Sequence, residues 1–120
     1  DFLIENDMTK VTIYHNPSCS KSRQTLALLA ENGIDATVIH YLETPPNEAT
    51  LRNIVHLLGV SAIEIIRTGE KEFKEEMHNW SEEQLVQAIN EHPILMQRPI
   101  VVANDQARIG RPPEAVLEIL

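Results

Sequence analysis

The segment whose residues could carry out chemistry is YHNPSCSKSR, residues 14–23, which contains the only cysteine of the chain, Cys19. A β-forming run leads into it and a helical pattern starts at Ser20, so the thiol should lie where a strand gives way to a helix. The first amides of a helix have no acceptor within the helix, and the helix dipole adds partial positive charge there. Lys21 and Arg23 add two cations. We therefore expect a lowered thiol pKa and an exposed thiolate that acts as a nucleophile.

The same amides are suited to cradle an anion, so nucleophile and anion site should coincide. His15 is close to both in the sequence and is expected to add charge. The whole chain has a net charge of −8, which argues against non-specific binding to nucleic acid or to an anionic membrane. A local basic site for a small anion is compatible with that charge, because net charge does not describe a cleft.

Other roles for a lone cysteine fit the sequence less well. One cysteine cannot form a disulfide within the chain, and a redox C-x-x-C motif would need a cysteine at Ser22. A phosphatase-type loop would need an arginine at Thr25. A structural zinc site needs several Cys or His ligands at close spacing, whereas the histidines are scattered. A cysteine that merely fills space at a turn is the remaining alternative.

Length and composition are typical of one ordinary globular domain. The chain has 120 residues, of which 42% are hydrophobic and 23% charged. It has no apolar run as long as a membrane span, and residues 1–7 lack the basic region of a signal peptide. Met8 resembles a native start, so we expect residues 1–7 to be a non-native addition or a flexible N-terminus. A free thiol without a signal peptide predicts a reducing, cytoplasmic location.

The residues around the cysteine predict a βαβ unit. A β-type run over 11–14 is followed by a helix that starts at residue 20 and stops at Asn32-Gly33. A second run, 36–42, is rich in Val, Ile and Tyr. A strand, a helix and a strand within about 30 residues predict a parallel pair of strands with a right-handed crossover.

The remainder of the chain predicts helices and then a hairpin. Residues 47–92 have helical patterns, including a short helix from Ser61 to about Arg67. Two β-type runs, 99–103 and 107–110, flank the turn residues Asn104-Asp105-Gln106, and Pro112-Pro113 opens a last helix. We therefore predict an α/β fold: a thioredoxin-like βαβ–ββα sheet with an inserted helical subdomain at about 47–92, in a single domain over residues 8–120.

Four motifs together resemble the single-cysteine arsenate reductase family that is coupled to glutathione and glutaredoxin. They are YHNPSCSKSR, YLETPP, HPILMQRPIVV and RIGRPPEAVLEIL. The resemblance extends from about Val11 to Leu120 and implies a thioredoxin-like fold. It also implies that the thiolate of Cys19 attacks arsenate and that glutathione then adds to the arsenic. Arsenite leaves, and glutaredoxin resolves the mixed disulfide between Cys19 and glutathione.

The resemblance also implies roles for individual residues. Arg67, Arg98 and Arg111 would clamp the oxyanion with planar, always-charged guanidinium groups. His15 would assist the thiolate of Cys19, and Ser22 would lie near the bound oxyanion. Pro99 would follow a cis peptide bond beside the cysteine. No bound cofactor and no metal are expected, and glutathione would act as a co-substrate.

Two other functions remain open at the level of sequence. A paralogous single-cysteine thiol reductase with a different acceptor would have the same oxyanion clamp. An Spx-like regulator that binds RNA polymerase belongs to the same superfamily, although such regulators usually carry C-x-x-C, where this chain has Ser22 in place of the second cysteine. We expect arsenate, glutathione and glutaredoxin as partners, and neither nucleic acid nor a membrane.

Overall fold

The structure, a computed structural model, describes residues 10–120, which form two compact units. The described part of the sheet unit comprises residues 10–39 and 98–120, and the helical unit comprises residues 40–97. The expectation for residues 1–7 lies outside the described residues.

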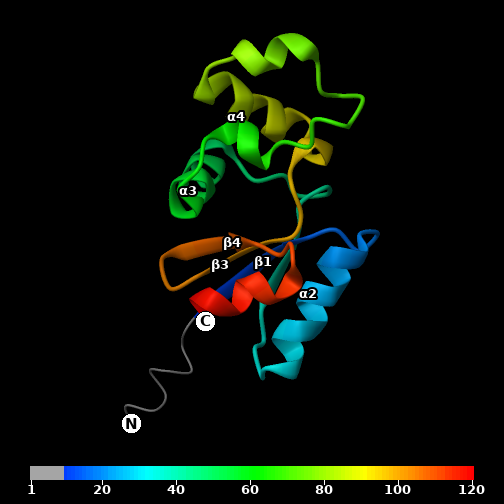
Figure 1. The fold of residues 1–120 in the computed structure, drawn as a ribbon, viewed down its shortest axis with the longest axis vertical. Coiled ribbons are helices and arrows are strands. Elements are labelled where there is room, and N and C mark those ends of the chain that lie inside the picture. The colour runs from blue at the N-terminus through cyan, green and yellow to red at the C-terminus, as the bar shows by residue number, and fades with distance from the viewer. Residues whose placement is uncertain (1–9) are drawn as a thin grey trace. The chain divides into compact units, whose positions relative to one another are not determined.

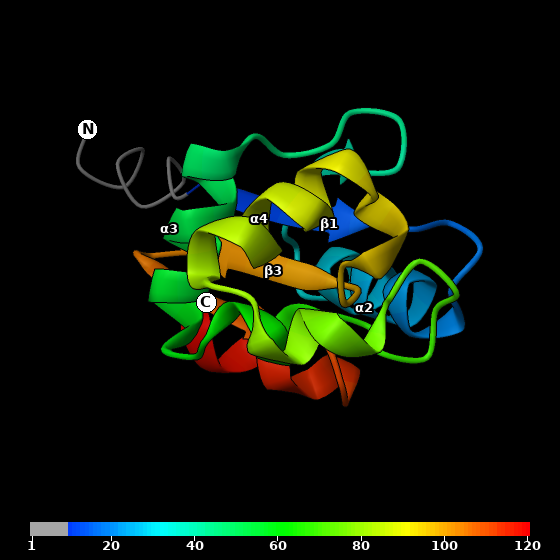
Figure 2. The same cartoon turned by 90° about the horizontal axis from the view of Figure 1, so that it is seen from above.

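A four-stranded sheet with the order β2-β1-β3-β4 forms the centre of the sheet unit. The elements of this unit are β1 (Val11–His15), α2 (Ser20–Glu31), β2 (Thr37–His40, whose last residue begins the helical unit), β3 (Ile100–Ala103), β4 (Gln106–Ile109) and the 3-10 helix η4 (Pro113–Ile119). β1 and β3 lie side by side in both views and pair antiparallel, as do β3 and β4 (Figure 1, Figure 2). The order strand–helix–strand, then strand–strand–helix, confirms the predicted α/β, thioredoxin-like fold.

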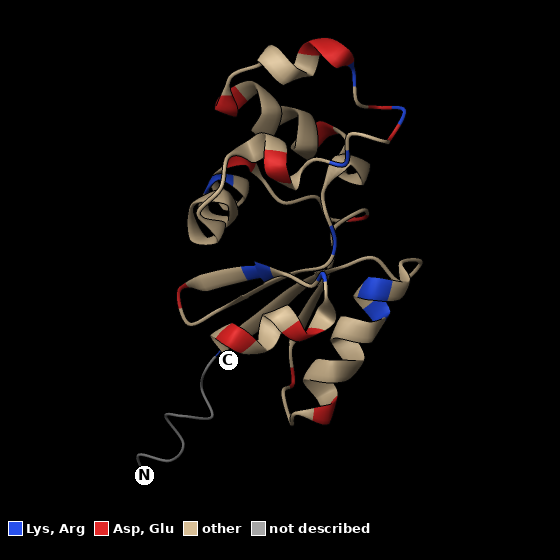
Figure 3. Cartoon of the chain, viewed as in Figure 1, with Lys and Arg blue, Asp and Glu red and all other residues tan. Residues whose placement is uncertain are grey.

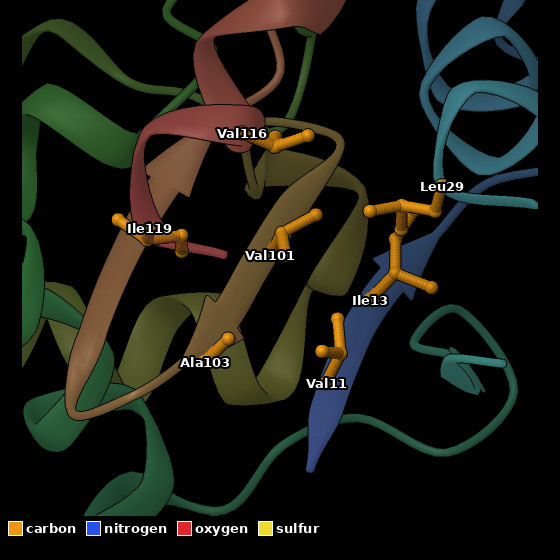
Figure 4. Packing of buried hydrophobic residues seen from close by; sticks show 7 residues of the cluster. All are labelled: Val11, Ile13, Leu29, Val101, Ala103, Val116 and Ile119. Carbon is orange, nitrogen blue, oxygen red and sulfur yellow. The ribbon is translucent and has the colours of Figure 1, made fainter. Parts of the chain in front are cut away.

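One face of the sheet packs against α2 and η4 (Figure 4). The buried cluster consists of Val11, Ile13, Leu29, Val101, Ala103, Val116 and Ile119. Ile13 lies directly opposite Val101 across the β1–β3 pair, and neither side chain is exposed. Burial of a side chain of this size stabilises a fold by about 1.5–3 kcal/mol. The cluster therefore fixes α2, and with it the cysteine at its N-terminus, against the sheet.

Two elements of the sheet unit differ from the sequence-based expectation. β2 ends at His40, whereas the β-type run continues to residue 42, because the carbonyl of His40 accepts the backbone N–H groups of Glu43 and Thr44 at 2.9 and 3.0 Å and the chain turns. The last helix is a 3-10 helix.

The hairpin turn is tighter than expected. Gln106 already belongs to β4, so Asn104 and Asp105 form the turn with φ angles of 53° and 58°. Asn and Asp tolerate this left-handed conformation better than other non-glycine residues, which explains their place here. The Asn104 amide also donates to the carbonyl of Ile119 at 2.8 Å and thereby ties the end of η4 to the hairpin.

The helical unit is built from short, well-capped helices. They are α3 (Glu48–Leu58), η1 (Ala62–Ile65), η2 (Glu75–Asn79), α4 (Glu82–Glu91) and η3 (Pro93–Leu95). The side chain of Asn47 accepts the Thr50 N–H at 2.8 Å at the start of α3, and Ser81 caps α4 in the same way through Gln84 at 3.2 Å. Helices therefore occupy the segment for which an inserted subdomain is predicted. The single domain over residues 8–120 stays a prediction.

The short helix expected from Ser61 to about Arg67 ends earlier, at Ile65. Ile66 is extended and forms an antiparallel bridge with Met96. The backbone N–H of Arg67 donates to the carbonyl of Leu95 at 2.7 Å. This pairing between two segments distant in sequence replaces the last helical turn that the local pattern predicts.

Charge is divided unevenly between the units (Figure 3). Residues 40–97 contain ten Glu and four Lys or Arg, whereas residues 10–39 and 98–120 contain five acidic and six basic residues. The acidic excess thus lies in the helical unit, and the unit that carries the cysteine is nearly neutral. Within residues 10–120, no helix combines the length and the apolarity needed to cross a bilayer.

Three segments of the sheet unit meet at Gly110. Its N–H donates to the carbonyl of Pro99 at 2.9 Å. A Cβ atom at Gly110 would lie 2.5 Å from Oγ1 of Thr25 and 2.7 Å from Cγ of Pro99, so only glycine fits. The Arg98–Pro99 peptide bond is cis, as predicted, and the Arg111–Pro112 bond is also cis.

Substitution of Gly110 by Ala should therefore lower the free energy of unfolding by about 1–3 kcal/mol, the usual range for an overpacked site. Urea denaturation measures this change. Gly69→Ala is the matched control, because a Cβ atom there meets nothing within 4 Å. That variant should be neutral or slightly stabilised, since alanine restricts the unfolded chain. Equal stability of the two variants would contradict the close contact at Gly110.

Candidate active site

Cys19 occupies the N-cap position of α2, directly after the loop that leaves β1. Its backbone N–H donates to the carbonyl of Asn16 at 3.0 Å. The Asn16 side chain accepts the N–H of Ser18 at 2.9 Å, so the carbonyl and the side chain of Asn16 both shape the turn. The Cys19 side chain is buried, with 9% of the residue exposed, and the expected exposed thiolate is wrong in this respect.

A buried pair of side chains joins the end of β1 to the first turn of α2. Oγ of Ser22 accepts the backbone N–H of Asn16 at 3.0 Å and lies 2.7 Å from Nδ1 of His15. Ser22 is fully buried and His15 is 5% exposed. Because a buried polar group left without its partner is costly, this pair fixes the loop that holds Cys19. The His15 ring thus contacts Ser22, and the assistance of His15 to the thiolate stays a prediction.

The pKa of the Cys19 thiol lies below its ordinary value. Burial raises the pKa, but hydrogen bonds from the Ser22 backbone amide, the Arg98 side chain and the Lys21 backbone amide lower it, as does the charge of Arg98. The helix amides therefore act as the sequence predicts. The charge comes from a different residue than expected: it belongs to Arg98, two residues before β3, whereas Arg23 donates through Nη1 to the carbonyl of Pro17 at 2.8 Å.

Two arginines distant in sequence approach the sulfur. Nη2 of Arg111 donates to Sγ of Cys19 at 3.6 Å, and Nε of Arg111 donates to the carbonyl of Arg98 at 2.9 Å. Nε and Nη1 of Arg98 are buried and find no acceptor among the described residues. Buried guanidinium N–H groups normally have acceptors. The arrangement therefore presents a thiolate together with donors suited to an oxyanion.

Arg67 belongs to the helical unit and forms an ion pair there. Its Nε donates to Oε2 of Glu70 at 3.2 Å, in an ion pair of which both side chains are about one-quarter exposed. The structure thus brings Cys19, His15 and Ser22 together in the sheet unit, along with the other two arginines. The predicted role of Arg67 as a third arginine of the clamp stays a prediction.

Similarity to known proteins agrees with this geometry. The family model described as "ArsC family" matches residues 14–119. The chain belongs to the ArsC family. This confirms the resemblance seen in the sequence motifs at the level of the family.

Members of the ArsC family similar to this chain include named and uncharacterized proteins. A protein of Escherichia coli (strain K12), named "Uncharacterized protein YfgD", is 58% identical over 118 residues, which cover 94% of this chain and 99% of the relative. The arsenate reductase of the same organism is 40% identical over 116 residues, covering 94% and 82%. A solved structure, an arsenate reductase from Vibrio cholerae, has a TM-score of 0.89 and 50% identity and covers 93% of this chain and 98% of that one.

Asn16 is a site residue that the sequence interpretation did not single out. It is 5% exposed and holds the loop through its N–H, its carbonyl and its side chain. A signal existed, because Asn before Pro in a turn often bonds to the backbone two residues further on. Gly110 was missed as well, and no local pattern reveals that its neighbours come from two other segments.

Arg98→Gln should raise the pKa of the Cys19 thiol, because burial continues to raise it while one hydrogen bond and one charge are lost. The rate of alkylation by neutral iodoacetamide, followed against pH, measures this pKa. The wild-type midpoint should lie below the roughly 8.5 of a free cysteine, and the variant midpoint should lie above that of the wild type. At neutral pH the variant should therefore react more slowly.

Arg23→Gln is the matched control for this experiment, since it removes the same charge from a guanidinium that bonds to the carbonyl of Pro17. Its midpoint should stay close to that of the wild type. A larger shift for Arg23→Gln than for Arg98→Gln would contradict the assignment of the charge to Arg98.

Proposed function

We propose that this protein reduces arsenate to arsenite, with Cys19 as the nucleophile. The observation that carries the proposal is the meeting of a thiol of lowered pKa with the guanidinium groups of Arg98 and Arg111. A thiolate attacks an electrophilic centre, and guanidinium groups hold the oxygens around that centre. Membership of the ArsC family, which includes relatives named arsenate reductase, supports the identity of the oxyanion.

The reaction begins with binding of arsenate at the two arginines. Arg111 is held by the carbonyl of Arg98 through Nε, which leaves its outer nitrogens for the sulfur and the anion. The thiolate of Cys19 then forms a bond to arsenic, and one arsenate oxygen leaves as water after protonation. Because the helix amides already stabilise negative charge at this point, they favour both the thiolate and the approaching anion.

Completion of the reaction requires a second thiol, for which we propose glutathione. Its sulfur adds to the arsenic adduct and then bonds to the sulfur of Cys19, while arsenic takes up two electrons and leaves as arsenite. Cys19 and glutathione end as a mixed disulfide. The thiolate of a glutaredoxin attacks the glutathionyl sulfur and frees Cys19. No bound cofactor takes part in this scheme, and we propose a cytoplasmic location, where such thiols are kept reduced.

A second candidate is the reduction of another acceptor by the same chemistry. The observation that favours it concerns two relatives from Escherichia coli (strain K12). The one named uncharacterized is 58% identical to this chain and thus more similar to it than the arsenate reductase, which is 40% identical. The thiolate, the arginines and the thiol partners would serve a different oxyanion or an oxidised thiol. Measured turnover with arsenate separates the two candidates.

Arg111→Lys should weaken oxyanion binding by roughly tenfold, which corresponds to loss of one charge-assisted hydrogen bond of about 1.5 kcal/mol. Lysine keeps the charge but lacks the planar guanidinium group, in which Nε bonds to the Arg98 carbonyl while the outer nitrogens remain for the sulfur and the anion. Calorimetric titration with sulfate and with arsenate measures the change, and the melting temperature should remain nearly constant. Arg108→Lys, at a guanidinium paired with Glu118, is the control and should bind normally. Unchanged affinity in Arg111→Lys would contradict the clamp.

Arsenate turnover should need both glutathione and glutaredoxin, and thioredoxin should substitute poorly. The chain has no second thiol to displace the product from Cys19, and glutaredoxins recognise the glutathionyl half of a mixed disulfide. Mass spectrometry after a single turnover without glutaredoxin should show one glutathione attached to Cys19. Cys19→Ser should abolish turnover.

Two results would change this proposal in different ways. If dithiothreitol or thioredoxin alone supported turnover as fast as glutathione with glutaredoxin, the single-cysteine scheme would be wrong. If no thiol system reduced arsenate while Cys19 still became glutathionylated, the second candidate would replace the first.

A further inference from the structure

Thr25 is a buried polar residue that the mechanism above does not use. It lies in α2, about one helical turn after Lys21, and no part of it is exposed. Because buried hydroxyl groups normally have hydrogen-bond partners, the surroundings of this one indicate what it does in the fold. The Thr25 hydroxyl has neighbours in two different segments of the site.

The first neighbour is the opening turn of α2. Oγ1 of Thr25 donates to the carbonyl of Lys21 at 2.8 Å. The backbone amide of the same lysine hydrogen-bonds to the sulfur of Cys19. A threonine in a helix divides between two rotamers, and one of them makes this bond to a carbonyl in the preceding turn. The bond therefore fixes the direction in which the Thr25 hydroxyl points.

The second neighbour is Gly110, at the end of the β3–β4 hairpin. A Cβ atom at Gly110 would lie 2.5 Å from Oγ1 of Thr25, so the hydroxyl oxygen packs on the glycine. The Gly110 N–H donates to the carbonyl of Pro99 at 2.9 Å and joins the two ends of the hairpin. Arg98 precedes one of these ends and Arg111 follows the other. One oxygen atom therefore contacts both the first turn of α2 and the junction from which the two arginines extend.

The size of the atom at this contact determines how closely the hairpin approaches α2, because protein interiors are tightly packed. Two carbon atoms in contact stay about 3.5–4.0 Å apart, whereas an oxygen atom approaches a Cα–H group to about 3.3–3.6 Å. A methyl group in place of the Thr25 hydroxyl would thus push Gly110 outward. The bond from Nη2 of Arg111 to Sγ of Cys19 is already 3.6 Å long, so a small outward displacement would weaken it.

We propose that Thr25 is a positioning residue for the reaction at Cys19. Its hydroxyl, held by the Lys21 carbonyl and packed on Gly110, sets the spacing between the first turn of α2 and the two arginines of the hairpin. The inference rests on the proposed function, because in that scheme these arginines hold the anion that the sulfur attacks. Thr25 acts through the groups that it spaces and not on the substrate itself.

Three substitutions in the full chain divide the Thr25 side chain into its parts. Thr25→Ser keeps the hydroxyl and loses the methyl group, and Thr25→Ala loses both. Thr25→Val replaces the hydroxyl with a second methyl group. Thr25→Ser and Thr25→Ala therefore differ by one oxygen atom, which isolates the hydroxyl, whereas Thr25→Val adds bulk against Gly110.

The pKa of the Cys19 thiol and the affinity for sulfate are the readouts, because both depend on where the arginines lie. Alkylation by iodoacetamide against pH gives the pKa, and calorimetric titration gives the affinity. Thr25→Ser should keep both close to the wild-type values. Thr25→Ala should raise the thiol pKa and weaken sulfate binding. Thr25→Val should do so more strongly, by up to roughly tenfold in affinity, as expected for loss of one charge-assisted hydrogen bond.

Thr44→Val is the matched control for the change from threonine to valine. The hydroxyl of Thr44 also donates to the carbonyl four residues earlier, that of His40, at 3.2 Å, but it is exposed and lies in the helical unit. The same chemical change at this position should leave the thiol pKa and the sulfate affinity as in the wild type. A shift in Thr44→Val as large as in Thr25→Val would contradict the proposal.

A role of Thr25 in stability alone leads to a different result. Thr25→Ser and Thr25→Ala would then both unfold at lower urea concentration, but their thiol pKa and sulfate affinity would be equal. That result would overturn the positioning role, as would a shift in Thr25→Ser as large as in Thr25→Val. If Thr25→Val does not fold, the comparison of Thr25→Ser with Thr25→Ala decides by itself, and the thiol pKa decides if sulfate binds too weakly to be titrated.

The outcome is separable from the proposed function, since neither readout requires turnover of arsenate. If arsenate is not reduced but the thiol pKa and the sulfate affinity follow the Thr25 hydroxyl, the positioning role stands and the acceptor is a different one. If arsenate is reduced while all three Thr25 variants keep the wild-type values, the positioning role fails alone.

Discussion

The balance between burial and hydrogen bonding at Cys19 is the constraint on which the site depends. A buried thiolate is costly, since burial by itself raises the thiol pKa. The helix amides at Lys21 and Ser22 and the guanidinium of Arg98 more than offset that cost. The protein can therefore place its nucleophile inside the fold, where electrostatic interactions are stronger than in water, and still keep it reactive.

Much of the sheet unit positions the amides and guanidinium groups that lower the pKa of Cys19. The cluster around Ile13 and Val101 fixes α2 on the sheet, and the direction of α2 determines where its free amides point. The β3–β4 hairpin brings its two ends together through the bond from the Gly110 N–H to the carbonyl of Pro99. Arg98 precedes one end and Arg111 follows the other, so a backbone contact sets the spacing of two side chains that are 13 residues apart.

The sequence predicts what depends on local chemistry. The strand, the Cys19 turn and the first amides of α2 follow from residue type and spacing, and the structure agrees. Charge at the sulfur was assigned to neighbours in sequence such as Arg23, whereas it comes from Arg98. The contact around Gly110 and the early end of the helix at Ile65 also depend on segments that meet only in the fold. Proximity in the chain is a poor guide to such partners.

The burial of Ser22 bears on how one-cysteine and two-cysteine versions of this loop relate in evolution. A second thiol at this position would stand where the serine hydroxyl bonds to the Asn16 amide and contacts His15, with no part of the residue exposed. Sulfur is larger than oxygen and a weak acceptor. Acquiring a second reactive cysteine therefore demands compensating changes in the loop and at the end of β1. Replacement of Ser22 by cysteine alone is therefore not expected to convert one redox strategy into the other.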